Sequence, residues 1–237
     1  MDRIKMLWFE KHPEVLQNLI DQLRASFPTM QVVIQNKKTY IRGSLYIIDP
    51  ETDREIDRFG IEIGLPDDYP HSVPSVTETE DRIPKTIDRH FMSDGSACLF
   101  FRDEQHKFYN KKTSIIDFIK IPVYNFFLSQ SYYELTGKWI FGTRPHGRGA
   151  ATWDYYAEEL GTDDIYTIGG FLCFLASEKL NVKQKCYCGS DKPLVNCHIK
   201  KVIEMRKKVS ITIALQSLQA MTVMRDNLQE ALKNRMK

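Results

Sequence analysis

The sequence predicts an α+β protein, in which an N-terminal helix precedes a four-stranded antiparallel meander and further helices follow it. Three observations carry this prediction: a helical period before residue 27, alternating segments joined by tight polar turns, and a Cys/His cluster before a long helical stretch. A meander needs only short connections and offers one face for a helix to cover, so this order of segments favours an α+β fold. At 237 residues, the chain is long enough for one or two domains.

The first elements follow from local periodicity. Apolar residues recur at helical spacing between Val15 and Leu23, and Pro13 stands where the first turn begins. Residues 30–35 and 39–49 are typical of strands, and the polar residues 36–38 between them predict a tight turn.

The meander continues through a third and a fourth strand. Residues 59–65 alternate apolar with small or charged residues, as a half-buried strand does. The passage 65–76 contains Pro66, Pro70 and Pro74, and each proline removes a backbone donor and disfavours helix before it. We therefore expect an extended segment there, and a short fourth strand at 75–78.

Helices dominate the remainder. A glycine-punctuated loop over 83–99 delivers Cys98, Ser114 is placed to cap a helix over 115–120, and Pro122 is placed to open another that runs to about residue 135. We also expect a helix over 153–159 and a buried helix over 165–180, in which Cys173 is a core residue. After Pro193 the chain has no glycine or proline, and apolar residues from Ile211 onward predict a long terminal helix.

Composition excludes several classes of protein. With 42% hydrophobic and 27% charged residues the chain is neither disordered nor fibrous, and a net charge of +2 is too balanced for a protein that binds nucleic acid over its whole surface. No apolar run approaches the roughly 18 residues of a membrane span, and the first residues lack the apolar segment of a secretory signal. We therefore expect a cytoplasmic protein without a membrane partner.

Four metal-ligating residues lie within a short segment. Three thiols and one imidazole follow the pattern Cys-x-Cys-x8-Cys-His, formed by Cys186, Cys188, Cys197 and His198. In a reducing compartment such a cluster favours a metal over a disulfide, and three thiolates with one imidazole complete a closed tetrahedral zinc site. We predict structural Zn²⁺, with redox dithiol chemistry as the alternative. A boundary near residues 183–185 then divides a main domain, 1–182, from a small module, 183–237.

The proline passage and the Cys98 loop carry a family resemblance. From Phe59 to Val76 the chain reads Phe-x-Ile-x-Ile-x-Leu-Pro-x-x-Tyr-Pro-x-x-x-Pro-x-Val, and His90 and Gly95-Ser96-Ala97-Cys98-Leu99 follow. This order resembles that of ubiquitin-conjugating enzymes, over roughly residues 5–135. Residues 137–156 resemble the extension of bacterial members of the superfamily.

The resemblance implies an acyltransferase of the ubiquitin-conjugating fold, with Cys98 as the thioester nucleophile. The eukaryotic enzymes follow the loop histidine with Pro-Asn, whereas this chain has Phe91-Met92 after His90. Some bacterial relatives carry a downstream histidine instead, which points to His146. Donors for the oxyanion are His90, His146, Ser93 or a backbone N–H, since such a donor must lie about 3 Å from the developing charge.

The resemblance also implies partners. Bacterial relatives occur in anti-phage operons, so the expected acyl donor is a ubiquitin-like protein or the C-terminus of a nucleotidyltransferase, with an activating enzyme as a further partner. The Cys/His cluster resembles the SEC-C zinc motif, which implies that residues 183–237 contact a protein or a nucleic acid, with the target protein as the expected partner. Residues 199–237 contain nine Lys or Arg residues against three acidic ones, which indicates either a solvated helix face beside a packed stripe or a docking arm for an acidic partner.

Three other functions stay open on the sequence. The fold is shared with RWD-type binding domains that lack the cysteine, so a non-catalytic scaffold is the main alternative. A hydrolase that pairs Cys98 with His90 or His146 is another. An adaptor for nucleic acid, built on the zinc module and the basic helix, is the third, although we expect nucleic acid not to be the partner.

Overall fold

The computed structural model describes residues 7–49, 51–145 and 147–235, and the chain divides into two compact units. The sheet unit comprises Met1–Phe100 and Lys107–Gly142, and the helical unit comprises Phe101–His106 and Thr143–Lys237. Residues 143–182 thus group with the Cys/His cluster, whereas the sequence suggested a boundary at residues 182 and 183.

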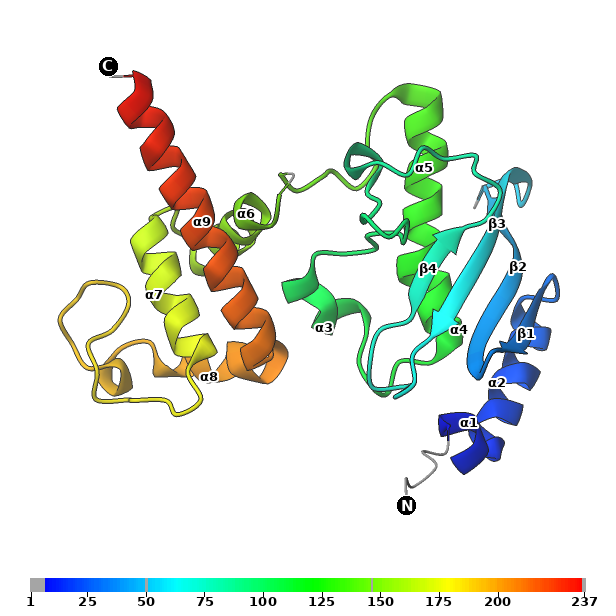
Figure 1. Ribbon diagram of the computed structural model, residues 1–237, viewed down its shortest axis with the longest axis horizontal. Helices are drawn as coiled ribbons and strands as arrows, with labels where there is room; N and C mark the ends of the chain where they lie inside the picture. Colours follow the sequence, from blue (N-terminus) through cyan, green and yellow to red (C-terminus); the bar gives the residue numbers. More distant parts are fainter. Residues whose placement is uncertain (1–6, 50, 146, 236–237) are drawn as a thin grey trace. The chain divides into compact units, whose positions relative to one another are not determined.

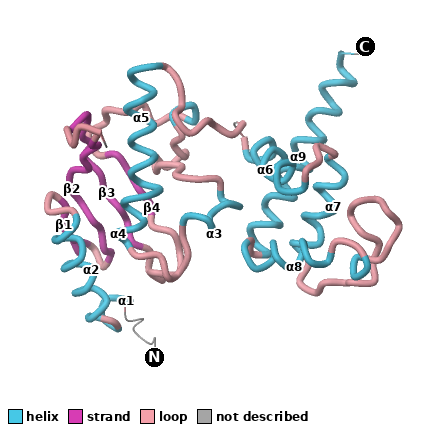
Figure 2. The backbone as a smooth tube through the Cα atoms, turned by 180° about the vertical axis from the view of Figure 1, so that it is seen from behind, coloured by secondary structure: helices cyan, strands magenta, loops and turns pink. Residues whose placement is uncertain are grey.

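The sheet unit contains the predicted meander. Its strands are β1 (Met30–Gln35), β2 (Lys38–Ile48), β3 (Glu55–Leu65) and β4 (Ser75–Glu78), and they pair antiparallel in the order β1-β2-β3-β4 (Figure 2). Asn36 and Lys37 both have left-handed backbone angles, with φ of 51° and 62°. Two such residues form the tight turn whose twist matches a hairpin, which fixes the register of β1 on β2.

Helices cover one face of this sheet (Figure 1). A short helix, α1 (Trp8–Lys11), precedes α2 (Pro13–Ser26), which has Pro13 in its first turn as predicted. Leu19 and Leu23 of α2 are buried with Ile41 and Ile61 of the strands and with Phe127 of a later helix. The alternating apolar side chains of the strands therefore find a continuous apolar partner, which is what stabilises a single-faced sheet.

The later helix runs through Pro122 instead of beginning there. Helix α4 (Ile115–Phe118), a π-helical turn η3 (Ile119–Val123) and α5 (Tyr124–Thr136) follow one another without interruption. Proline lacks an N–H and its ring needs room in the preceding turn, and a widened turn supplies that room. The Ser114 hydroxyl accepts the Asp117 N–H at 3.0 Å, which confirms the predicted cap.

Between the sheet and α4 the chain forms loops and single turns. The proline passage contains no strand or helix over residues 66–74, as expected. The turns that follow β4 are η1 (Ile87–Arg89), η2 (Arg102–Glu104) and α3 (Gln105–Phe108).

The helical unit is built from α6 (Arg148–Leu160), α7 (Ile165–Ala176), η4 (Leu194–Asn196), α8 (Ile199–Lys208) and α9 (Ile211–Arg235). Helix α9 packs along α6 and α7. At Gly149 of α6, an added Cβ would lie 2.6 Å from the Ala220 carbonyl oxygen, so only glycine allows this approach of α6 to α9. Val209, buried and extended at φ −113° and ψ 124°, separates α8 from α9.

Cys173 is a correction to the sequence analysis, because its side chain is exposed and not part of the core. Helix α7 buries Ile168, Phe171, Leu172 and Leu175, which recur at three- and four-residue spacing. A position one residue beyond Leu172 is rotated by about 100° from it, and this places Cys173 on the other side of the helix.

Within the described ranges, no helix has both the length and the apolar character that crossing a bilayer requires.

Candidate functional site

The loop before Cys98 folds into a small hairpin. Phe91 pairs with Ala97 in an isolated bridge, and the Met92 N–H donates to the Ser96 carbonyl oxygen at 2.8 Å. At the base of the hairpin, the Cys98 N–H donates to the His90 carbonyl oxygen, also at 2.8 Å. The structure thus brings two residues singled out by the sequence, His90 and Cys98, together through the main chain.

The tip and the outer side of the hairpin are fixed as well. Gly95 has a φ of 80°, and the Asp94 carboxylate accepts both the Ser96 N–H at 3.0 Å and the Ser96 hydroxyl at 2.6 Å. The Ala97 N–H donates to the Val76 carbonyl oxygen at 2.7 Å, which ties the hairpin to β4. Cys98 therefore lies at the end of an ordered loop, as a positioned nucleophile requires.

The Cys98 side chain is half-buried, with its thiol 3.8 Å from the Phe100 carbonyl oxygen. Burial raises the pKa of the Cys98 thiol above its ordinary value. A nucleophilic cysteine acts as the thiolate, so the loop presents the sulfur in its less reactive form near neutral pH.

The two histidines differ in what the structure describes. The His90 backbone is left-handed, with φ 56° and ψ 42°, and its half-buried ring packs edge-on against Trp139, with the ring centroids 4.6 Å apart. His146 lies outside the described residues, so its predicted role stays a prediction.

In the helical unit, the four predicted ligand residues converge. One ligand atom from each of Cys186, Cys188, Cys197 and His198 lies within 4.8 Å of all the others. The Cys188 and Cys197 sulfurs are 3.6 Å apart, and His198 Nδ1 lies 3.3 Å from the Cys186 sulfur and 3.1 Å from that of Cys197. Sulfurs bound to one tetrahedral zinc ion lie about 3.8 Å apart, so the cluster is positioned to hold a metal ion of that size.

A short hairpin and a helix start create this arrangement. The Cys186 N–H donates to the Lys192 carbonyl oxygen at 2.9 Å, and the Leu194 N–H donates to that of Gln184 at 2.8 Å. Gly189 turns the chain between these two hydrogen-bonded segments with a φ of 73°, and His198 directly precedes α8. This loop therefore brings Cys186 and Cys188 close to Cys197 and His198.

Ser190 is a residue of this cluster whose role the sequence did not predict. Its hydroxyl lies 3.2 Å from the Cys188 sulfur and 3.4 Å from the Cys197 sulfur. The hydrogen bond to Ser190 is the main cause that lowers the pKa of Cys188 to about 6. A hydroxyl two residues after a ligand cysteine, in a Gly-Ser turn, is the sequence feature that would have indicated this contact.

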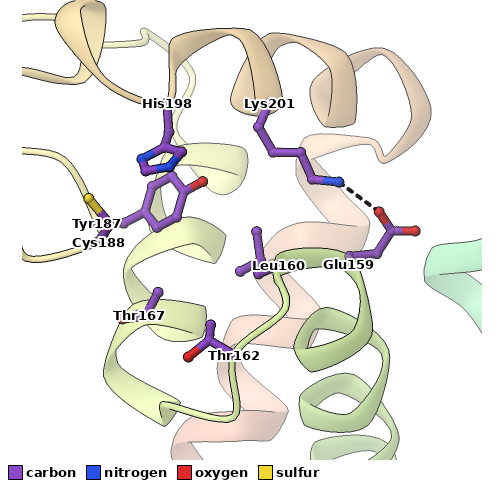
Figure 3. A pocket seen from close by; sticks show the side chains of 8 residues that line it. All are labelled: Glu159, Leu160, Thr162, Thr167, Tyr187, Cys188, His198 and Lys201. Atoms are coloured by element: carbon purple, nitrogen blue, oxygen red, sulfur yellow. Dashed lines mark hydrogen bonds and ion pairs between the residues drawn. The ribbon is translucent and has the colours of Figure 1, made fainter.

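A hollow of about 430 Å³ borders the cluster. Tyr187 and His198 lie close together on one side of it, and the Lys201 ammonium meets a Glu159 carboxylate oxygen at 2.9 Å on another (Figure 3). His198 is exposed while Cys186 is buried. The cluster therefore lies at the surface of the helical unit and not in its interior.

No protein-family model matches the chain, and comparison with curated proteins and with solved structures gives no match either. The resemblances to ubiquitin-conjugating enzymes and to the SEC-C motif therefore rest on the residues quoted for them.

Proposed function

We propose that this protein is a ubiquitin-conjugating-enzyme-like acyltransferase. In this proposal Cys98 carries the C-terminus of a small protein as a thioester and passes it to a target. The acyl donor is a ubiquitin-like protein, delivered by an activating enzyme, or the C-terminus of a nucleotidyltransferase. The setting we propose is bacterial anti-phage defence in the cytoplasm.

One observation carries the proposal: Cys98 is half-exposed and ends an ordered hairpin whose base is the hydrogen bond from its N–H to the His90 carbonyl oxygen. A cysteine kept only for packing needs neither this hairpin nor access to solvent. The hairpin also follows a helix, a four-stranded meander and a proline passage, in the order that the resemblance requires.

The proposed reaction is a transthiolation followed by acyl transfer. The Cys98 thiolate attacks the carbonyl carbon of a thioester on the activating enzyme, a C–S bond forms, and the bond to the activating enzyme's sulfur breaks. The departing thiolate then takes up a proton. In the second step an amine nitrogen of the target attacks the same carbon, an amide forms, and Cys98 leaves as a thiolate while the nitrogen loses its proton.

The hydrogen bonds of the loop narrow the choice of oxyanion donor. The N–H groups of Met92, Ala97 and Cys98 already donate to carbonyl oxygens, so they are not available to a developing negative charge. Of the donors that the sequence suggested within the described loop, the side chains of His90 and Ser93 are the ones we propose.

For the metal cluster we propose structural Zn²⁺. Three thiolates and an imidazole are ligands that zinc prefers, and four protein ligands leave no open position for catalysis. When bound, the ion would cross-link the loop that carries Cys186 to the start of α8. We further propose that this module recognises the protein target, since its ligand cluster lies at the surface beside a hollow lined by both polar and apolar side chains.

A non-catalytic scaffold is the second candidate, and one observation favours it. Burial raises the pKa of the Cys98 thiol, which is the opposite of what activates a nucleophile.

The experiment that separates the two is purification of the Cys98→Ser protein from the organism that encodes it, with intact-mass analysis. Serine would replace a labile thioester with a sturdier ester, so a loaded intermediate survives isolation. The matched control is Cys173→Ser, which alters an exposed thiol of the helical unit.

The acyltransferase proposal predicts an alkali-labile protein adduct on the serine at position 98 and none on the serine at position 173. The mass of the adduct would identify the donor. Absence of any adduct, together with unchanged function of Cys98→Ala in the host, would establish the scaffold instead.

A further inference from the structure

The side chain of His90 is held by an aromatic residue to which the proposed reaction assigns no role. The rings of His90 and Trp139 meet edge to face, with centroids 4.6 Å apart and an interplanar angle of 71°. This is a preferred geometry for two aromatic rings. Trp139 is only partly exposed although it follows the end of a surface helix.

Trp139 is in turn fixed from behind. Its ring stacks on Tyr133 of α5 at 4.4 Å and 23°, and the Arg89 guanidinium carbon lies 4.9 Å from the centroid of the Tyr133 ring. The chain can return to this position because Gly137 ends α5 in a left-handed conformation, with a φ of 69°. His90, Trp139, Tyr133 and Arg89 thus form a continuous stack, which we call the aromatic brace.

The far end of the brace is anchored by a reciprocal pair of hydrogen bonds. Arg89 Nε donates to Gln130 Oε1 at 2.9 Å, and Gln130 Nε2 donates back to the Arg89 carbonyl oxygen at 2.8 Å. Gln130 is fully buried, and an Arg89 Nη2 atom lies 3.2 Å from a Glu134 carboxylate oxygen. Arg89 directly precedes His90, so α5 holds the loop at Arg89, and Trp139, which follows α5, contacts it at the next residue.

What the brace holds is the residue that positions Cys98. His90 adopts a left-handed backbone that a non-glycine residue rarely keeps without support, and its carbonyl oxygen accepts the Cys98 N–H at 2.8 Å. A rotation of His90 would move that acceptor and release the base of the hairpin.

We propose that Trp139 is a positioning residue for the Cys98 site, acting through His90. In the proposed reaction Cys98 is the nucleophile. The His90 carbonyl oxygen fixes the Cys98 backbone, and Trp139 packs against the His90 ring and so keeps His90 in its left-handed conformation. This inference rests on the proposed function for its catalytic meaning, but its physical content is the accessibility of the Cys98 sulfur, which can be measured without any acyl donor.

The test compares alkylation of Cys98 by iodoacetamide in the full-length protein, followed by peptide mapping that resolves each cysteine. The variants are Trp139→Ala and Trp139→Phe. Phe141→Ala serves as the control, because Phe141 lies two residues further on and its side chain is 61% exposed. His90→Gly is a second variant, which removes the ring while glycine keeps the left-handed backbone accessible.

We expect Trp139→Ala and His90→Gly to speed alkylation of Cys98 about fivefold, the factor that the loss of one aromatic pair allows. Trp139→Phe, which retains an edge-to-face contact, should restore the parent rate to within about twofold. Phe141→Ala should react as the parent does, and Cys173 should alkylate equally in every variant.

Two results would overturn the inference: an unchanged Cys98 rate in both Trp139→Ala and His90→Gly, or a Trp139→Phe variant as fast as Trp139→Ala. If the brace variants behave as expected but Cys98→Ser never acquires an adduct, then the proposed function fails while the brace stands. In a loaded enzyme the same Trp139→Ala change should slow acyl transfer while it speeds alkylation. Because unfolding would also produce both effects, the inference requires that Trp139→Ala keep the urea unfolding midpoint of the parent protein.

Discussion

The Cys98 thiol combines a positioned backbone with an unfavourable environment for ionisation. Burial raises its pKa, and its sulfur lies 3.8 Å from a carbonyl oxygen, which cannot stabilise a negative charge. The thiolate fraction near neutral pH is therefore below that of a free cysteine. If Cys98 is the nucleophile, its activation must accompany the arrival of the acyl donor.

This gives a prediction about pH. The rate of Cys98 alkylation by iodoacetamide should rise with pH to a midpoint above that of N-acetylcysteine measured alongside, because the folded protein holds the proton more tightly. By linkage, the stabilisation from the protonated thiol is complete below the pKa of the unfolded chain and is lost as pH rises through the higher folded-state pKa. A midpoint at or below that of N-acetylcysteine would contradict the burial argument.

For single residues, the sequence indicates which side chains could bind a metal better than it indicates how buried a side chain is or what it contacts. The convergence of the four ligand residues was predictable because their spacing and residue type alone indicate it. Cys98 was singled out through the family resemblance, and its role stays a proposal. Cys173 was assigned to the core from its apolar neighbours, but α7 buries a stripe that includes Ile168, Phe171, Leu172 and Leu175, and Cys173 lies outside it. Trp139 could not be given a role, because its contact with His90 depends on how α5 ends and on where the loop returns.

Among the elements, strands and capped helices were the predictable part. The meander and the start of α2 follow from alternation and from Pro13, which act within a few residues. The uninterrupted path through Pro122 was not predictable, since the widened turn there is kept by packing of Ile119 and Val123 in the core and not by local preference. The short helix α1 lacks enough residues to show a period.

The loop that carries the metal ligands has little core of its own, and this leads to a prediction about metal. Leu194 is buried, but most of residues 179–196 are half-buried or exposed. We expect purified protein to contain one equivalent of zinc, and Cys188→Ala to lose it, because a missing thiolate opens the tetrahedral site. Elemental analysis and far-ultraviolet circular dichroism would measure both the metal and the helix content.

The matched control for the zinc experiment is Cys173→Ser, since Cys173 is a cysteine of the same unit outside the cluster. It should keep its zinc and its melting temperature. Equal zinc content in Cys188→Ala and Cys173→Ser would show that the cluster does not hold the ion.

Over the whole molecule, the chain passes between the two units more than once, so no single boundary divides it. The chain enters the helical unit at Phe101, three residues after Cys98, returns to the sheet unit at Lys107 and crosses again after Gly142. Composition gives no sign that residues 101–106 belong to the helical unit, because the hydrogen bonds that hold them there join residues separated by 53 and 114 positions. That is why a boundary near residue 183 was the natural prediction.

A buried carboxylate, that of Asp103, holds residues 101–106 in the helical unit. Asp103 is 1% exposed, and its oxygens accept the Tyr156 hydroxyl of α6 at 2.8 Å and the Ser217 hydroxyl of α9 at 2.8 and 2.9 Å. Arg144 adds a second link, with two of its guanidinium nitrogens 3.0 and 3.1 Å from the Glu104 carboxylate. The segment that follows the candidate nucleophile is thus an integral part of the helical unit.

Removing this carboxylate should loosen the helical unit and the segment together. Asp103→Ala leaves the Tyr156 and Ser217 hydroxyls buried without their acceptor, so we expect it to lower the free energy of unfolding by about 2–3 kcal/mol. Tyr156→Phe removes one hydrogen bond together with the tyrosine hydroxyl, so we expect it to lower that free energy by only about 1 kcal/mol. Urea titration measures this, with Asp163→Ala as the exposed carboxylate control. Hydrogen exchange should show the amides of residues 101–106 losing protection before those of the strands. If these amides instead stay protected in Asp103→Ala, other contacts, such as that between Arg144 and Glu104, hold the segment, and the buried carboxylate is not what ties residues 101–106 to α6 and α9.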